Sequence, residues 1–310
     1  MRVAILGATS EIAKDLIRLF LIDKDIELVL FARRPQAVED WANHNKISGN
    51  FSSRNFSSFG IKEDYDVLIN FVGVGNPTEA VALGPSIFDV TLKYDDIAMD
   101  YLKHHPECRY VFLSSGAVYG SSFLVPVDIK TKAEINVNKF SPQDWYGVSK
   151  LHAECRHRAM PHLSIVDIRI FNYFSNKQNM DAGFLIADIV RAITDNKILE
   201  TSEDPISRDY VGAEDLYQLV RKIIAFSATN EVVDCYSRAP IDKFTLLTCM
   251  QEKFGLRYQL GRGYFGVNAT GAKANYYSLN KKAKDFGYQP KFTSLELVLR
   301  EIESYMKDEL

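Results

Sequence analysis

The feature that most constrains the fold is a regular alternation of short apolar runs with longer segments of helical spacing. Residues 2–6 form an apolar run that ends at Gly7, and residues 12–22 follow with apolar side chains at helical intervals. The pattern recurs, with strand-like runs at 27–31, 67–72, 109–113 and 164–170 and helix-like segments at 85–104 and 145–160. Apolar strands separated by helices indicate a parallel sheet covered on both faces. Right-handed crossovers then predict a doubly wound α/β fold with ligands at the carboxyl ends of the strands.

The pattern becomes less regular after residue 171. Helical and extended segments still alternate there, at 181–194, 208–211, 214–226 and 232–236. The last of these has the composition of one more strand of the main sheet. We therefore predict a sheet domain over 1–170, with 212–237 returning to it, and a smaller C-terminal lobe built from 171–211 and 238–310.

Charge and composition exclude several classes of function. The formal net charge is −3, whereas a nucleic-acid surface needs a basic excess. No apolar run approaches the roughly 20 residues of a membrane span, and residues 1–13 do not resemble a signal peptide. We therefore interpret the final Lys-Asp-Glu-Leu as the charged end of a helix and not as a retention address. We expect a cytoplasmic protein that binds neither nucleic acid nor membrane.

The cysteines do not indicate a metal site or a disulfide framework. They lie far apart, without the paired spacing of zinc ligands, at Cys108, Cys155, Cys235 and Cys249. The histidines also lack partners at metal-ligand spacing. We expect buried, reduced thiols and no bound metal.

A turn of small residues directly follows the first apolar run. It opens the first helix-like segment and reads Gly7-Ala8-Thr9-Ser10-Glu11-Ile12-Ala13. Small residues at this point let backbone N–H groups and a helix N-terminus approach a pyrophosphate. The alternative is a tight turn without a ligand, since only the first glycine of the usual motif is present. We predict a dinucleotide site that contacts Gly7, Thr9, Ser10, Glu11 and Ile12.

The second apolar run ends in Arg33 and Arg34, where a carboxylate would hold the ribose hydroxyls of NAD. A guanidinium pairs instead with the 2′-phosphate of NADP. Arg33 and Arg34 therefore favour NADP, with NAD as the alternative cofactor. The other interpretation is a solvated pair of arginines at the start of a helix. Phe71 and Val72, at the end of the run over 67–72, are further predicted cofactor contacts.

The strongest chemical signal is the segment Tyr146-Gly147-Val148-Ser149-Lys150. Residues four apart share one face of a helix, so the Tyr146 hydroxyl and the Lys150 ammonium point into the same cleft. A nearby ammonium stabilises phenolate, which predicts a lowered pKa for Tyr146 and a role in proton transfer. Ser115 follows the strand-like run over 109–113 and could hydrogen-bond the same reacting oxygen. The alternative for an isolated Tyr/Lys pair is an exposed amphipathic helix.

These segments together resemble the extended short-chain dehydrogenase/reductase family, in particular its NAD(P)-dependent nucleotide-sugar epimerases, dehydratases and reductases. The resemblance follows nearly the whole chain in order and spacing. Besides the glycine turn and the Tyr/Lys segment, it rests on Ser114-Ser115, Val118-Tyr119-Gly120, Arg169-Ile170-Phe171-Asn172, Arg208-Asp209-Tyr210 and Tyr288-Gln289-Pro290. It implies a Rossmann-type domain, a substrate-binding lobe, and a nucleotide-diphosphate sugar as substrate, in a role such as polysaccharide biosynthesis.

The resemblance also implies roles for the matching residues. Tyr146 would be the catalytic acid or base, and Lys150 would bind the nicotinamide ribose and tune Tyr146. Ser115 would bind the substrate and polarise its reacting oxygen, while Asn172 and Arg208 would contact the diphosphate. Family members commonly form homodimers through the helices that match 85–104 and 145–160. Apolar residues there could contact a partner or their own sheet, namely Tyr94, Ile97, Met99, Tyr101 and Leu102.

Several positions depart from the family pattern. Asn50 stands where the family has an aspartate that binds adenine, and its amide could still hydrogen-bond the base. Thr91 stands where an asparagine is usual. A second diphosphate arginine aligns with Asn268, with Arg262 or Lys273 as substitutes. These changes leave the redox residues intact and the identity of the substrate open.

The residues after Ser115 separate the reactions of the family. The 4,6-dehydratases resemble one another in carrying Asp-Glu there, because elimination needs a second acid/base pair. This chain has Gly116-Ala117, which excludes a dehydratase. Arg33-Arg34 favours reduction of a nucleotide-linked 4-keto-6-deoxy-hexose, with an NAD-dependent 4-epimerase as the alternative. A non-catalytic cofactor-binding protein is the third interpretation, against which the intact Ser/Tyr/Lys set argues.

Overall fold

The computed structural model describes residues 1–73, 80, 82–120, 123–181, 183–261 and 273–309. Arg262 and Asn268 lie outside the described residues. The helices are α1 (Glu11–Phe20), α2 (Pro35–His44), α4 (Ser86–Leu102), α5 (Pro142–Arg158), α6 (Leu185–Thr194), α7 (Ala213–Ala225), α8 (Lys243–Phe254) and α9 (Ser294–Glu309). Short 3₁₀ turns are η1 (Phe56–Ser58), η2 (Gly116–Tyr119), η3 (Val137–Lys139) and η4 (Lys282–Phe286). The strands are β1 (Arg2–Leu6), β2 (Glu27–Ala32), β3 (Phe51–Asn55), β4 (Val67–Asn70), β5 (Arg109–Ser115), β6 (Ile165–Ile170), β7 (Asn172–Tyr173), β8 (Ile198–Ser202), β9 (Ser207–Arg208), β10 (Tyr210–Val211), β11 (Glu231–Asp234), β12 (Ile241–Asp242), β13 (Arg257–Gly261) and β14 (Asn275–Tyr276).

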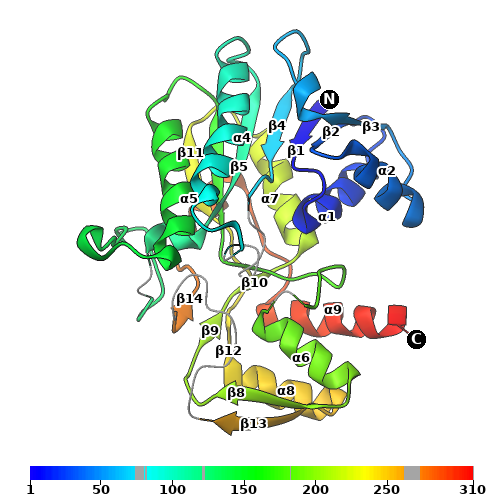
Figure 1. Ribbon diagram of the computed structural model, residues 1–310, viewed down its shortest axis with the longest axis vertical. Helices are drawn as coiled ribbons and strands as arrows, with labels where there is room; N and C mark the ends of the chain where they lie inside the picture. Colours follow the sequence, from blue (N-terminus) through cyan, green and yellow to red (C-terminus); the bar gives the residue numbers. More distant parts are fainter. Residues whose placement is uncertain (74–79, 81, 121–122, 182, 262–272, 310) are drawn as a thin grey trace.

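A parallel sheet forms the centre of the fold (Figure 1). In the described part of the chain it has seven strands, in the order β11-β6-β5-β4-β1-β2-β3. The chain order reverses between β1 and β4, and a crevice opens beyond the carboxyl ends of strands at such a point. The doubly wound, Rossmann-type α/β fold predicted from the sequence is confirmed.

Alternate side chains of the central strands enter two separate apolar layers. In β1, Val3 and Ile5 pack in one layer with residues of α1 and α7. Ala4 and Leu6 pack in the other layer with residues of α4 and α5. All four side chains are fully buried, because helices cover both faces of the sheet. This explains why the strands are apolar along their whole length.

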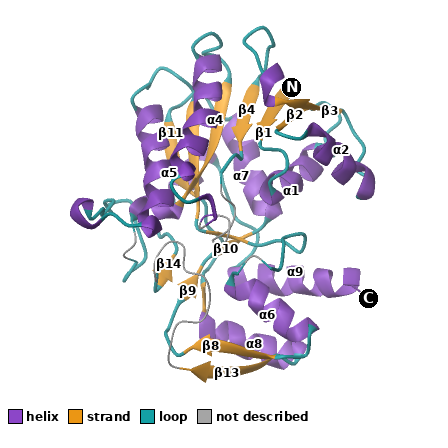
Figure 2. Cartoon of the chain, viewed as in Figure 1, coloured by secondary structure: helices purple, strands orange, loops and turns teal. Residues whose placement is uncertain are grey.

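A second apolar core lies in the C-terminal half of the chain. It is formed by α6, α8 and α9, which Figure 2 shows with β8 and β13 beyond one end of the central sheet. The chain leaves the sheet after β6 and comes back to it with β11, which pairs in parallel with β6. The domain boundaries at 170, 212 and 237 remain a division that we propose.

The ends of the elements differ from the sequence prediction where local chemistry overrides periodicity. The helix predicted over 145–160 begins at Pro142, because Ser141 and Asp144 form a capping box that starts it earlier. The sequence pattern does not predict β3, an edge strand that reads Phe51-Ser52-Ser53-Arg54-Asn55 and carries one apolar residue. Edge strands need not be apolar on both faces, which is why its periodicity is weak.

Two of the four cysteine side chains are buried as expected from the sequence. Cys108 and Cys235 are buried, but the expectation is wrong for Cys155, which lies on the exposed side of α5, and Cys249 is half-buried. Among the described residues, no group of His, Cys, Asp and Glu side chains could hold a metal ion. None of the described helices is long and apolar enough to cross a membrane.

Candidate active site

A cleft of about 1850 Å³ opens at the carboxyl ends of the central strands and continues along the C-terminal lobe. Of the residues predicted from the sequence, Arg34 and Asn50 do not line it. The others lie along its walls, namely Gly7, Thr9, Ser10, Glu11, Ile12, Arg33, Phe71, Val72, Ser115, Tyr146, Lys150, Asn172 and Arg208. Residues from distant parts of the chain therefore face one continuous space.

Gly7 lies where the backbone turns from β1 towards α1. Its φ is +84°, and a Cβ atom there would lie 2.9 Å from the Val72 nitrogen and 3.0 Å from the Phe71 carbonyl carbon. Only glycine fits both requirements. The Gly7 N–H donates to the Phe31 carbonyl oxygen at 2.9 Å. The N–H groups of the first turn of α1 are not capped by the Ser10 side chain, so this helix end fits a pyrophosphate.

Two of the predicted cofactor contacts, Arg34 after β2 and Asn50 before β3, do not line the cleft. Arg33 and Arg34 are both exposed. Of the two, Arg33 lines the cleft, whereas Arg34 is the N-cap residue of α2. Asn50 precedes β3, and its carbonyl oxygen accepts a hydrogen bond from the Leu28 N–H at 2.9 Å. It therefore lies at the amino ends of β2 and β3, whereas the cleft lies at the carboxyl ends of the strands. The carboxyl end of β3 instead brings Phe56 to the cleft. Sequence reasoning misses Phe56 because it does not find β3.

Ser115, Tyr146 and Lys150 converge on the cleft from two elements. Ser115 ends β5, and the other two residues lie one turn apart on α5. The Ser115 hydroxyl is hydrogen-bonded to that of Tyr146. The Lys150 Nζ atom donates to the Leu113 carbonyl oxygen at 2.7 Å and lies 4.4 Å from the centre of the Phe112 ring. The three predicted groups are therefore held in a fixed arrangement at one wall.

Burial acts on both titratable groups of this wall. It lowers the pKa of Lys150 to about 8, and carboxylates on α4, β6 and α5 oppose that change. It raises the pKa of Tyr146, which the hydrogen bond with Ser115 opposes. The lowered Tyr146 pKa expected from the sequence is not found, because the Lys150 ammonium is directed at the Leu113 carbonyl.

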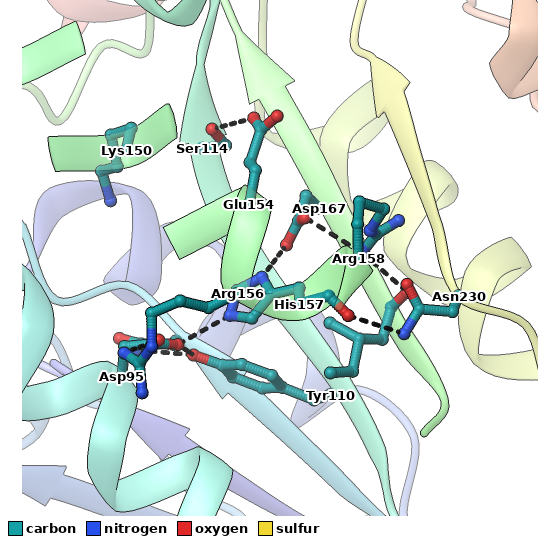
Figure 3. Close-up of polar contacts among 12 residues, drawn as sticks. Asp95, Tyr110, Ser114, Lys150, Glu154, Arg156, His157, Arg158, Asp167 and Asn230 are labelled. Atoms are coloured by element: carbon teal, nitrogen blue, oxygen red, sulfur yellow. Dashed lines mark hydrogen bonds and ion pairs between the residues drawn. The ribbon is translucent and has the colours of Figure 1, made fainter. Parts of the chain in front are cut away.

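An acidic residue one turn beyond Lys150 ties α5 to the sheet. Glu154 accepts a hydrogen bond from the Ser114 hydroxyl at 2.5 Å (Figure 3). It also accepts one from Arg169 Nε at 3.0 Å. Ser114 precedes the predicted catalytic serine in β5. The position of α5 relative to the end of β5 is therefore fixed by charge as well as by packing.

His157 continues the same face of α5 and is fully buried. Its Nε2 atom lies 2.8 Å from an Asp95 carboxylate oxygen and its Nδ1 atom 2.7 Å from one of Asp167 (Figure 3). Arg156 and Arg158 pair with the second oxygens of these two carboxylates at 2.7 and 3.0 Å. Burial alone would lower the pKa of His157, but Asp167 and then Asp95 raise it to about 9. The imidazole is thus held as a cation between two helices and the sheet.

The C-terminal lobe forms the opposite wall of the cleft. Arg208 Nη1 donates to the Lys273 carbonyl oxygen at 2.8 Å, and Asn172 Nδ2 donates to the Tyr276 carbonyl oxygen at 3.2 Å. Burial lowers the pKa of Lys273 to about 7, and the Arg208 charge acts in the same direction. Arg208, together with Lys273 when it is protonated, therefore places positive charge on this wall, which suits a polyanionic ligand.

Sequence reasoning misses Tyr276, which lines the cleft beside Ser115. Its strand, β14, has two residues and shows no periodicity. It reaches the site by pairing with β9, which lies far away in the sequence. A distant tyrosine of this kind gives no local signal.

The apolar residues of α4 that could contact a homodimer partner are mostly buried within the chain. Ile97 is half-buried, and the other four are buried, namely Tyr94, Met99, Tyr101 and Leu102. Met99, Tyr101 and Leu102 pack against the sheet in the same apolar layer as Ala4. The homodimer stays a prediction.

Comparisons with known proteins find one matching family and several solved structures of the same fold. The sequence profile described as the NAD dependent epimerase/dehydratase family matches residues 3–235. A comparison with curated proteins yields no match. Among solved structures, UDP-glucuronic acid 4-epimerase from Bacillus cereus, in complex with UDP-glucuronic acid and NAD, has a TM-score of 0.80 at 15% identity and covers 100% of both chains.

Two further structures have the same fold over their full length. UDP-glucose 4-epimerase from Bifidobacterium longum, in complex with NAD+ and UDP, has a TM-score of 0.77 at 18% identity, covering 100% of this chain and 99% of that one. dTDP-glucose 4,6-dehydratase from Bacillus anthracis, in complex with NAD, has a TM-score of 0.77 at 17% identity, covering 100% of this chain and 97% of that one. At these identities the likeness establishes the fold.

Proposed function

Because the chain belongs to the NAD-dependent epimerase/dehydratase family of enzymes, we propose that it transfers hydride between a nicotinamide cofactor and a ring carbon of a nucleotide-linked sugar. One observation carries the proposal. Ser115, Tyr146 and Lys150 share a single cleft with the glycine turn at Gly7 and with Arg208 on the lobe. The first three suit proton transfer at the oxygen on the reacting carbon, and the other two suit the phosphates of cofactor and substrate.

The residues at the sheet end of the cleft fit a dinucleotide. The close approach of backbone at Gly7 and the uncapped first turn of α1 provide the surface that a pyrophosphate needs. When bound there, the nicotinamide cofactor supplies or accepts the hydride. Tyr146 gives a proton to, or takes one from, the oxygen on the same sugar carbon, and Ser115 holds that oxygen by a hydrogen bond. Lys150, with a pKa of about 8, stays largely protonated at neutral pH and places a positive charge on the same wall of the cleft as Tyr146.

The finer proposal is that the reaction reduces a nucleotide-linked 4-keto-6-deoxy-hexose with NADPH. No carboxylate directly follows β2, and the exposed Arg33 lines the cleft there. The surroundings of Gly116 argue against a dehydratase. A side chain at this position would place its Cβ atom 2.4 Å from the Phe171 ring. The second acid/base pair that elimination needs therefore cannot project from this position.

An NAD-dependent 4-epimerase is the second candidate. The family description names NAD and epimerases, and two of the similar structures are 4-epimerases in complex with NAD. An epimerase keeps its cofactor and returns the hydride to the other face of the sugar, whereas a reductase exchanges its cofactor in every cycle. Cofactor preference and exchange therefore separate the two candidates.

The cofactor proposal is tested by titrating the cofactor-stripped protein with NADPH and with NADH, followed by nicotinamide fluorescence. We expect NADPH to bind at least tenfold more tightly, a difference of about 1.4 kcal/mol. Arg33→Ala should remove this preference, and the matched variant Arg34→Ala should keep it, because Arg34 does not line the cleft. A preference for NADH, or NAD that cannot be removed without unfolding, would make the epimerase the better account.

The role of Tyr146 is tested by removing its hydroxyl. Tyr146→Phe should abolish turnover of the nucleotide sugar and leave the dissociation constant of the cofactor unchanged, because only proton transfer is lost. Tyr277→Phe is the matched control, since Tyr277 does not line the cleft. Turnover near the wild-type rate in Tyr146→Phe would contradict the role of Tyr146 in proton transfer.

A further inference from the structure

Tyr276 lies beside Ser115 although its strand belongs to the lobe. β14 pairs in parallel with β9, and it brings the tyrosine to the end of β5. The hydroxyl oxygens of Tyr276 and Ser115 are 3.3 Å apart. A contact of this length is compatible with an active-site hydrogen bond that shortens when the reacting oxygen binds. The lobe therefore contributes a second tyrosine hydroxyl to the reaction centre.

Either hydroxyl of this pair could be the donor, and the other partners of Ser115 show what each direction would leave free. The Ala117 N–H donates to Ser115 Oγ at 3.2 Å, so this oxygen already accepts one hydrogen bond from the backbone. Each hydroxyl has one hydrogen and accepts through its oxygen lone pairs. The Tyr146 hydroxyl lies on the other side of Ser115. When Tyr276 donates to Ser115, the Ser115 hydrogen is left for Tyr146 or for the reacting oxygen.

The Tyr276 ring is fixed by contacts that do not involve its hydroxyl. The Phe123 ring packs edge-on with 4.8 Å between ring centres, and the Phe171 ring lies at 5.2 Å. The Lys273 ammonium lies 4.3 Å from the ring centre and the Arg208 guanidinium 6.0 Å from it. Phenylalanine at this position would keep these contacts. The hydroxyl can therefore be removed without disturbing the ring.

We propose that Tyr276 is a positioning residue whose hydroxyl donates to Ser115 and thereby directs the Ser115 hydrogen towards the reacting sugar oxygen. This inference rests on the proposed function, in which Ser115 holds that oxygen. Without the Tyr276 donor, the Ser115 hydroxyl rotates between several partners and must be organised during the reaction. The loss falls on kcat and leaves substrate binding unchanged.

Steady-state kinetics of Tyr276→Phe test the proposal in the complete protein, with NADPH and a nucleotide-linked 4-keto-6-deoxyglucose. We expect kcat to fall about tenfold and KM to change less than about twofold. Tyr277→Phe makes the same chemical change on the neighbouring residue, outside the cleft, and should leave both constants unchanged. An unchanged kcat in Tyr276→Phe overturns the proposal, as does an equal loss in the control.

A double-mutant cycle distinguishes positioning from a separate contact with the substrate. If Tyr276 acts through Ser115, the variant that combines Ser115→Ala with Tyr276→Phe turns over as slowly as Ser115→Ala alone. Losses that multiply would show that Tyr276 acts independently of Ser115 and would overturn the positioning role.

A measurement without substrate separates this inference from the proposed function. In protein labelled with 3-fluorotyrosine, the ¹⁹F resonance of Tyr146, assigned with Tyr146→Phe, reports its pKa. The Ser115 hydrogen bond lowers the pKa of Tyr146, so Tyr276→Phe should raise that pKa by about half a unit and Tyr277→Phe should not. An unchanged titration in Tyr276→Phe overturns the positioning role. A raised pKa in a protein that accepts no nucleotide sugar refutes only the proposed function.

Discussion

The buried His157 should make the stability of the fold depend on pH in a defined direction. Carboxylates accept hydrogen bonds and do not donate them, so the contacts with Asp95 and Asp167 require protons on both ring nitrogens. The pKa of His157 is raised from 6.5 to about 9. At about 1.4 kcal/mol per pKa unit, the shift contributes about 3 kcal/mol to folding. Because the folded-state pKa is the higher one, this contribution is complete below pH 6.5 and disappears as the pH rises through about 9.

The assay compares the free energy of unfolding of the wild type and of His157→Gln in urea, which leaves the ionic strength unchanged. The difference between the two proteins should shrink by about 3 kcal/mol between about pH 6 and about pH 9.5. His162→Gln replaces an exposed histidine and should follow the wild type at every pH. A difference that stays constant over this range would refute the reasoning, because His157 would then bind the same number of protons in the folded and unfolded states.

Three further predictions concern the cleft. Gly7→Ala should lower the free energy of unfolding by about 1–3 kcal/mol in urea denaturation, because its Cβ atom would lie 2.9 Å from the Val72 nitrogen. Gly147→Ala should reduce kcat/KM, because a Cβ atom 2.4 Å from the Ala117 carbonyl oxygen would push Tyr146 and its helix away from β5. The affinity for UDP or dTDP, measured by calorimetry, should fall as the pH rises through about 7, where Lys273 loses its charge, and Lys273→Gln should remove this dependence. Unfolding energies, rates or affinities that do not change would contradict the respective prediction.

Features that depend on local spacing could be predicted from the sequence. β1 is apolar at every position that faces either helical layer, so its pattern alone indicates a covered parallel strand. Tyr146 and Lys150 lie four residues apart in one helix, and that interval fixes their common face. Gly7 follows directly on a strand, where a turn with positive φ is needed. Each of these arguments uses a few neighbouring residues.

Features that depend on tertiary packing could not be predicted in the same way. Asn50 and Phe56 lie at opposite ends of β3, and choosing between them requires the bounds of a strand whose sequence is mostly polar. Tyr276 reaches Ser115 only because β14 pairs with β9 in the lobe. The burial that raises the pKa of Tyr146 likewise depends on the surrounding fold and not on the interval to the lysine.

The most direct test of the central claim follows the hydride itself. The protein is incubated with NADPH deuterated at C4 of the nicotinamide, on each face in turn, and with UDP- or dTDP-linked 4-keto-6-deoxyglucose, and the products are identified by NMR. We predict one deuterium at C4 of the sugar for each NADPH consumed from one of the two faces, and no transfer with Tyr146→Phe. In a parallel incubation with UDP- or dTDP-linked hexoses, interconversion of the 4-epimers without NADPH consumption or deuterium incorporation would contradict the reductase and support the epimerase. No reaction of either kind, in a folded protein that binds the cofactor, would contradict the proposed chemistry as a whole.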